Sequence, residues 1–147
     1  MQPFWFVLAL GSAILQLPGN EQGGSAASPE RVEFCQLIRK SELYDGKTII
    51  LKATYGGGIE GSVVFDEACR KTTSEDNVIT LAAFSPTEYR HGTPVDKKFQ
   101  RLLKKGFNVN LTVRAIFVDG KTRVFGHLNC CRYRIEIQEL MDVEAVH

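Results

Sequence analysis

The stretch YDGKTIILKATYGGGIEGSVVFDEAC, from Tyr44 to Cys69, contains two runs of strand-forming residues separated by glycines. Side chains alternate between the two faces of a strand, so the run Lys47–Tyr55 places every second residue on one apolar side. That side carries Ile49, Leu51, Ala53 and Tyr55. Gly56–Gly58 allow the chain to reverse sharply, and Gly61–Phe65 resumes as a second strand. These residues predict an antiparallel hairpin.

Three further strands follow the hairpin. The apolar run Val78–Phe84 predicts a third strand between polar loops at Arg70–Asn77 and Ser85–Asp96. Asn108–Val118 alternates, and its expected buried face holds Val109, Leu111, Val113, Ala115 and Phe117. The last strand is predicted over residues 130–140. It should turn Cys131, Tyr133, Ile135 and Ile137 inward and Arg132, Arg134, Glu136 and Gln138 outward.

Two short helices complete the pattern. The first is predicted to begin at Ser28–Glu30, because serine caps helices, proline tolerates the first turn and glutamate favours the positive end of the helix dipole. Its apolar residues are Val32, Phe34, Cys35, Leu37 and Ile38, and Asp45–Gly46 ends it. The second helix is predicted over Lys97–Lys105. It buries Phe99, Leu102 and Leu103 and ends at Gly106.

The order of these elements decides the fold class. Five strands with a helix between the third and the fourth form the element order of an OB-fold, which is a small, partly open Greek-key barrel. A β-sandwich needs about seven strands, and this chain has room for five. We therefore predict a mainly β protein: an OB-fold-like barrel with one short helix before strand 1 and another between strands 3 and 4.

The N-terminal region has a different composition from the rest of the chain. Pro3–Leu17 is apolar and uncharged, and it is shorter than the roughly 20 residues that span a bilayer. It fits the apolar region of a secretory signal, although no Lys or Arg precedes it, and an uncleaved membrane anchor is the alternative. We expect residues 1–27 to be signal peptide and linker, residues 28–147 to be the domain, and the product to be periplasmic or extracellular, with no stable membrane span after processing.

Composition limits the kind of partner. The 147 residues are the size of one domain, and their formal net charge is +1. Such a small charge gives no strong field to attract nucleic acid. We therefore expect a cell-envelope protein or a small ligand as the partner, and nucleic acid is disfavoured.

Three segments together resemble a family of exported bacterial proteins of unknown function. They are CQLIRKSELYDGKTIILKATY, GIEGSVVFDEAC and FGHLNCCRYRIEIQEL. The shared features are a leader containing a cysteine, Leu43–Lys47 entering an alternating strand, and Gly126–Leu128 entering the final strand. The likeness covers about Cys35 to Val143. It implies an OB-fold-like domain and brings no known substrate.

The four cysteines map toward one end of such a barrel. They are Cys35, Cys69, Cys130 and Cys131. An oxidising compartment favours disulfides. The resemblance includes both Cys35 and Cys69, and the hairpin geometry supports their pairing; a bond from Cys69 to Cys130 or Cys131 is the alternative. A zinc site of four thiolates lacks the usual C-x(2–4)-C spacing, so we expect no metal and no cofactor.

Ligand-binding candidates follow from the loops that OB-folds use. These are the loop after the first strand and the loop between the last two strands, here residues 56–61 and 119–129. The candidate residues are Tyr55, Glu60, Lys121, Arg123, Phe125 and His127. A loop of basic and aromatic residues suits stacking on a base or a sugar, and the alternative is a solvated hairpin tip.

No pattern of catalytic residues is present in the sequence. It lacks G-x-S-x-G, and YGGGIEG lacks the Lys-Ser/Thr of a phosphate-binding loop. We therefore predict a non-catalytic binding or interaction module. The alternatives are single-stranded nucleic-acid or oligosaccharide binding on the strand 2–3 face, and a secreted protein inhibitor.

Overall fold

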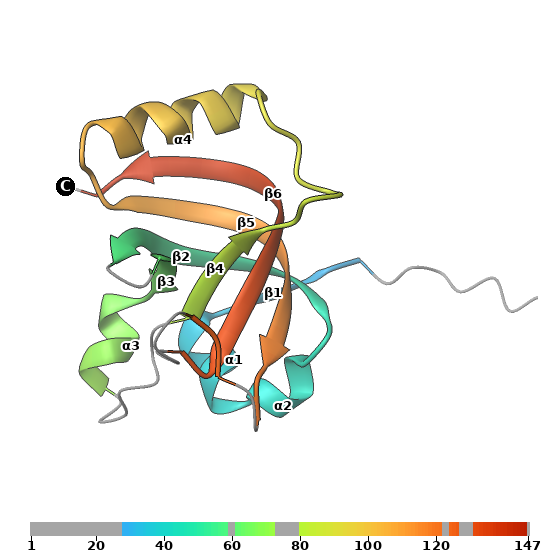
Figure 1. Ribbon diagram of the computed structural model, residues 1–147. Helices are drawn as coiled ribbons and strands as arrows, with labels where there is room; N and C mark the ends of the chain where they lie inside the picture. The colour runs from blue at the N-terminus through green and yellow to red at the C-terminus, as the bar shows by residue number, and fades with distance from the viewer. Residues whose placement is uncertain (1–27, 59–60, 73–79, 122–123, 127–130, 147) are drawn as a thin grey trace, which may run out of the picture.

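The computed structural model describes residues 28–58, 61–72, 80–121, 124–126 and 131–146, and it shows a mainly β protein (Figure 1). Five strands form a closed barrel, and a sixth lies outside it. The barrel strands are β2 (Thr48–Gly58), β3 (Gly61–Phe65), β4 (Thr80–Phe84), β5 (Val109–Asp119) and β6 (Tyr133–Ala145). The predicted fold class is therefore confirmed.

The barrel closes in the order that an OB-fold-like topology requires. β2 pairs with β3, β3 with β4, β4 with β6, β6 with β5, and β5 returns to β2. All of these pairs are antiparallel except β4 with β6, which is parallel. The start of β6 therefore lies beside the start of β4, where Thr80 pairs with Tyr133.

Alternating apolar residues fill the barrel. The predicted inward faces of β2 and β5 are buried, because every second residue of these strands points into the barrel. Phe99 lies fully buried at one end, where its ring centroid is 5.0 Å from that of Tyr55. Toward the other end, the rings of Phe117 and Tyr133 stack with centroids 5.6 Å apart.

The predicted first helix begins later than expected. Glu30–Val32 forms strand β1, which runs parallel to β2 outside the barrel and pairs Val32 with Leu51. β3 pairs with β2 only from Thr54 onward, so the earlier part of that edge is open to β1. This tertiary pairing overrides the local capping pattern. Helix α1 (Phe34–Arg39) and helix α2 (Ser41–Tyr44) then lead into β2.

Two other helices differ from their predicted bounds. Helix α3 (Glu67–Thr72) extends into the loop expected from Arg70, and the Cys69 N–H donates to Asp66 Oδ1 at its start. Helix α4 (Pro94–Lys104) begins three residues before the prediction, because Thr93 caps it and proline occupies its first turn.

One prediction for the last strand is wrong in an informative way. Gln138 was expected to point outward, yet it is only 7% exposed. Ala115 pairs with Ile137 and its neighbour Arg114 pairs with Glu139, so Gln138 is an extra residue in β6. Met141 is a second extra residue, since Leu140 and Asp142 pair with consecutive residues of β5. These two β-bulges shift the inward and outward alternation.

The predicted signal peptide and linker, residues 1–27, lie outside the described residues. In the part of the chain that the structure describes, no helix is long and apolar enough to cross a membrane.

Candidate functional site

Tyr55 lies in the core rather than on the surface. It is 6% exposed, and its ring lies against those of Phe99 and Phe84. Its hydroxyl donates to Ser62 Oγ on β3. Tyr55 therefore braces the β2–β3 pair from inside the barrel.

The structure describes Lys121 and Phe125 among the predicted loop residues, and both make contacts within the protein. Lys121 is exposed, with its Nζ 3.6 Å from Asp45 Oδ2. Phe125 is half-buried, and the guanidinium carbon of Arg134 lies 5.1 Å from its ring centroid. The other three loop candidates, Glu60, Arg123 and His127, lie outside the described residues.

A buried carboxylate fixes this end of the barrel. Asp119 Oδ2 accepts from Ser41 Oγ at 2.7 Å, and Oδ1 accepts from the Lys121 N–H at 3.0 Å and from Arg132 Nε at 3.2 Å. Burial tends to raise the pKa of Asp119, but these hydrogen bonds outweigh it and the pKa lies below its usual value. Both carboxylate oxygens of Asp119 accept hydrogen bonds from within the protein, so we assign this residue a structural role.

The cysteines fall into two groups. Cys35 on α1 and Cys69 on α3 are thiols in direct hydrogen-bond contact. Burial, followed by this contact, raises the pKa of Cys69 to about 12. Cys131 is buried and disulfide-bonded, and Cys130 lies outside the described residues. Within the described ranges, no three Asp, Glu, His or Cys side chains are grouped so as to hold a metal ion.

We expect Cys35 and Cys69 to become a disulfide when oxidised glutathione accepts their two electrons. The bond would close a loop of more than 30 residues and stabilise the protein by about 2–4 kcal/mol. Intact mass and urea unfolding of oxidised and reduced samples would measure both effects. Cys35→Ser is the control, because it leaves the Cys131 bond in place. Alkylation of both thiols in the denatured, oxidised protein would contradict the expectation.

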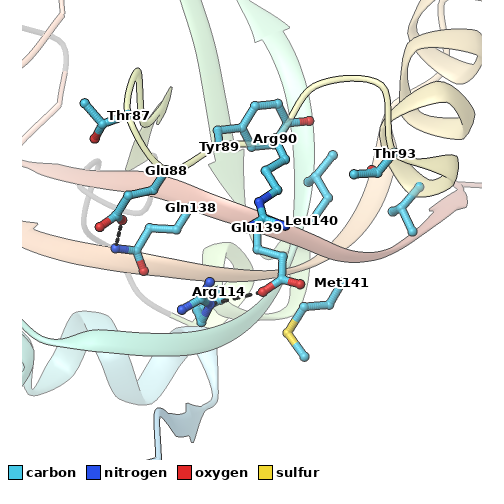
Figure 2. Close-up of a pocket in the computed structure, with 11 residues that line it drawn as sticks. Thr87, Glu88, Tyr89, Arg90, Thr93, Arg114, Gln138, Glu139, Leu140 and Met141 are labelled. Atoms are coloured by element: carbon cyan, nitrogen blue, oxygen red, sulfur yellow. Dashed lines mark hydrogen bonds and ion pairs between the residues drawn. The ribbon is translucent and has the colours of Figure 1, made fainter. Parts of the chain in front are cut away.

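A groove of about 860 Å³ lies between β6 and the segment that leads into α4 (Figure 2). This segment, residues 85–93, is called the wall segment below. The groove is lined by Thr87, Glu88, Tyr89, Arg90, Thr93, Val95, Arg114, Gln138, Glu139, Leu140 and Met141. None of these residues was among the sequence-based candidates.

The two bulges of β6 build the floor of this groove. Four consecutive residues, Gln138–Met141, line it, and two of them are the extra residues of the bulges. Because the bulges break the regular alternation of side chains, four consecutive residues of β6 can line one groove. β4 leaves this edge after its last pair, Phe84 with Ile137.

Asp96 holds the wall segment in place. It is 5% exposed, and it accepts from the Tyr89 hydroxyl and from the Gly92 N–H, both at 2.6 Å. The Asp96 N–H donates in turn to Thr93 Oγ1 at the start of α4. The hydrogen bond from Tyr89 is the main cause of a lowered pKa at Asp96, and burial raises the pKa of Tyr89. These contacts make the wall segment a preformed surface.

Gln138 carries an unsatisfied acceptor beside the groove. Its Nε2 donates to the carboxylate of Glu88 (Figure 2), and a carboxylate only accepts, so the orientation of the amide is fixed. Gln138 Oε1 is buried and has no hydrogen-bond partner among the described residues. Leaving such an atom unpaired costs about 1–3 kcal/mol.

The charges of the groove are mixed. Arg114 Nε lies 3.1 Å from Glu139 Oε2 in an exposed pair, and Glu88 and Arg90 add one charge of each sign on the wall segment. Met141 is 41% exposed and supplies an apolar rim. The groove therefore offers charged, hydrogen-bonding and apolar contacts. Among its lining residues there is no Ser–His or Cys–His pair to support nucleophilic chemistry.

Comparison with family models, curated proteins and solved structures gave no match. The resemblance to exported bacterial proteins stays a prediction.

Proposed function

We propose that this protein is an exported, non-catalytic binding module that takes its ligand in the β6 groove. The observation that carries the proposal is the Gln138 amide in the groove lining: Glu88 fixes its orientation, and its buried Oε1 has no partner among the residues that the structure describes. Native proteins pair nearly all buried polar atoms, so an unpaired one on a residue that lines a groove favours an external donor. The groove volume also falls within the roughly 300–1,000 Å³ that is typical of ligand sites.

Two features support export. The apolar run Pro3–Leu17 has the length of a signal-peptide core. The contact between Cys35 and Cys69 places two thiols where an oxidising compartment would join them. Finding residues 1–27 on the exported protein would contradict the processing that we propose.

A second surface supports the alternative of nucleic-acid or oligosaccharide binding. On the outer face of β3 and β4, Val63 pairs with Leu81, and Leu81 pairs with Arg134 of β6. Arg134 stacks on Phe125, which gives this face one cationic and one aromatic group. Because Arg134 also pairs with Glu136, we rank this face second.

An NMR experiment distinguishes the two surfaces. A mixed set of small-molecule fragments is added to the processed protein, and the changes in amide chemical shift show where they bind. We expect the largest shifts at Glu88–Arg90 and Gln138–Met141, and we expect Gln138→Leu to abolish them. Exposed Asp142→Asn, on the same strand, is the matched control and should retain them. Shifts that instead concentrate on Leu81 and Arg134 and weaken with salt would favour the alternative. Turnover that is lost in His127→Ala and Glu60→Ala would overturn the non-catalytic assignment.

A further inference from the structure

We propose that the ligand is an extended segment of a partner polypeptide, which adds a strand to β6 along Gln138–Met141. This inference rests on the function proposed above and names the class of ligand. It depends on the open edge of β6, on the four consecutive β6 residues that line the groove, and on the charge of the facing wall.

The edge of β6 is open over the length of the groove. β4 pairs with β6 as far as Ile137, and the Ser85 N–H then donates a main-chain hydrogen bond to the Ile137 carbonyl, at 2.8 Å. Within the described residues, no strand pairs with Gln138–Met141 on this side. β6 continues to Ala145, and α4 lies along its second half (Figure 1). The edge of β6 is therefore open between the end of β4 and the part of β6 that α4 covers.

A ligand in the groove lies beside four consecutive residues of β6, and within the described residues no strand pairs with them on the β4 side. Unpaired main-chain N–H and C=O groups on a strand edge form the template for another extended chain. A peptide satisfies them with a matching repeat, whereas a sugar or nucleotide has no such repeat. A strand opposite four residues is about 13 Å long.

Charge complementarity specifies the peptide further. Arg90 is exposed on the wall segment and, within the described residues, makes no ion pair. Figure 2 shows its side chain extending from the wall segment toward β6. An acidic side chain on the peptide face toward the wall would pair with Arg90. Apolar side chains would meet Met141 and Val95 at the rim.

The test is selection of displayed random heptapeptides on the immobilised processed protein. We expect selected peptides to alternate apolar and polar residues and to share one acidic position. Methylating the peptide amide nitrogens one at a time should abolish binding at every second residue, because alternate N–H groups face the edge. The Arg90→Glu variant should weaken binding about tenfold, and selection on it should replace the acidic residue with a basic one.

Arg101→Glu on the exposed face of α4 is the matched control and should bind the peptides as the native protein does. Failure to enrich peptides, or a methylation pattern without the two-residue period, would overturn strand addition. If the fragments of the NMR experiment still mapped to the groove in that case, the proposed binding function would stand and only strand addition would be wrong. If peptides bound but shifted residues outside the groove, the site itself would be wrong. A dimer joined through Gln138–Met141 would show that a second copy takes this edge instead.

Discussion

Replacing Asp119 by alanine should lower the free energy of unfolding by about 3 kcal/mol. The change removes a buried carboxylate and leaves the Ser41 hydroxyl and the Lys121 N–H without their acceptor. It also separates the ion pair with Arg132, whose side chain is 40% exposed and can turn to water. That exposure places the cost at the lower end of the 3–5 kcal/mol typical of breaking a buried pair. Chemical denaturation at pH 7 would measure it.

Asp142→Ala is the control for this prediction, because Asp142 is exposed on the neighbouring strand and should change stability by no more than about 0.5 kcal/mol. The pH dependence supplies a second readout. The pKa of Asp119 is lower in the folded protein than the ordinary 3.8, so its charge stabilises the fold above that pH. The contribution disappears as pH falls through the folded value. The native protein should therefore lose more stability below pH 3.8 than Asp119→Ala does, and equal losses would contradict the assignment.

The barrel was predictable because its strands obey a simple period. From Ile49 to Tyr55 on β2 and from Val109 to Phe117 on β5, every second residue is apolar and buried. This pattern fixes both the strands and the direction in which they face. The closing pairs then follow from strand order, because five strands with this connectivity have few ways to bury one face each.

The elements that the sequence did not predict are those decided by distant contacts. Glu30–Val32 has the local features of a helix start and becomes a strand because the adjacent edge of β2 is free. α3 (Glu67–Thr72) extends into the loop predicted from Arg70, and Asp66 accepts from the Cys69 N–H at its beginning. Neither outcome is encoded in the local periodicity.

The groove was missed because regular alternation was assumed to the end of β6. The sequence does carry a mark of the bulges: Ile137, Leu140 and Val143 are spaced by three instead of two. All three are buried, so each interval contains one extra residue. Such spacing within a strand predicts a bulge. The wall segment is not predictable in this way, since its position depends on Asp96 reaching back to Tyr89 and Gly92.

Asp96→Ala should lower the free energy of unfolding by about 3 kcal/mol and also abolish binding in the groove. The variant loses two hydrogen bonds to a charged acceptor and leaves the buried Tyr89 hydroxyl unpaired. It also removes a negative charge from the first turn of α4, which contributes about 0.3–1 kcal/mol. Since α4 is anchored separately by the fully buried Phe99, we expect the barrel to remain folded while the wall segment loosens.

Tyr89→Phe separates the two effects of Asp96. It removes one hydrogen bond but keeps the ring against Phe84 and the bond from the Gly92 N–H, so it should cost about 1 kcal/mol and retain the groove. Hydrogen exchange at Glu88–Gly92 and groove binding would be measured on both variants. Because the pKa of Asp96 lies below 3.8 in the folded protein, protection in the wall segment should persist above that pH and fade as the carboxyl is protonated below it. If Asp96→Ala kept native protection and binding, the carboxylate would not be what holds the wall segment against β6.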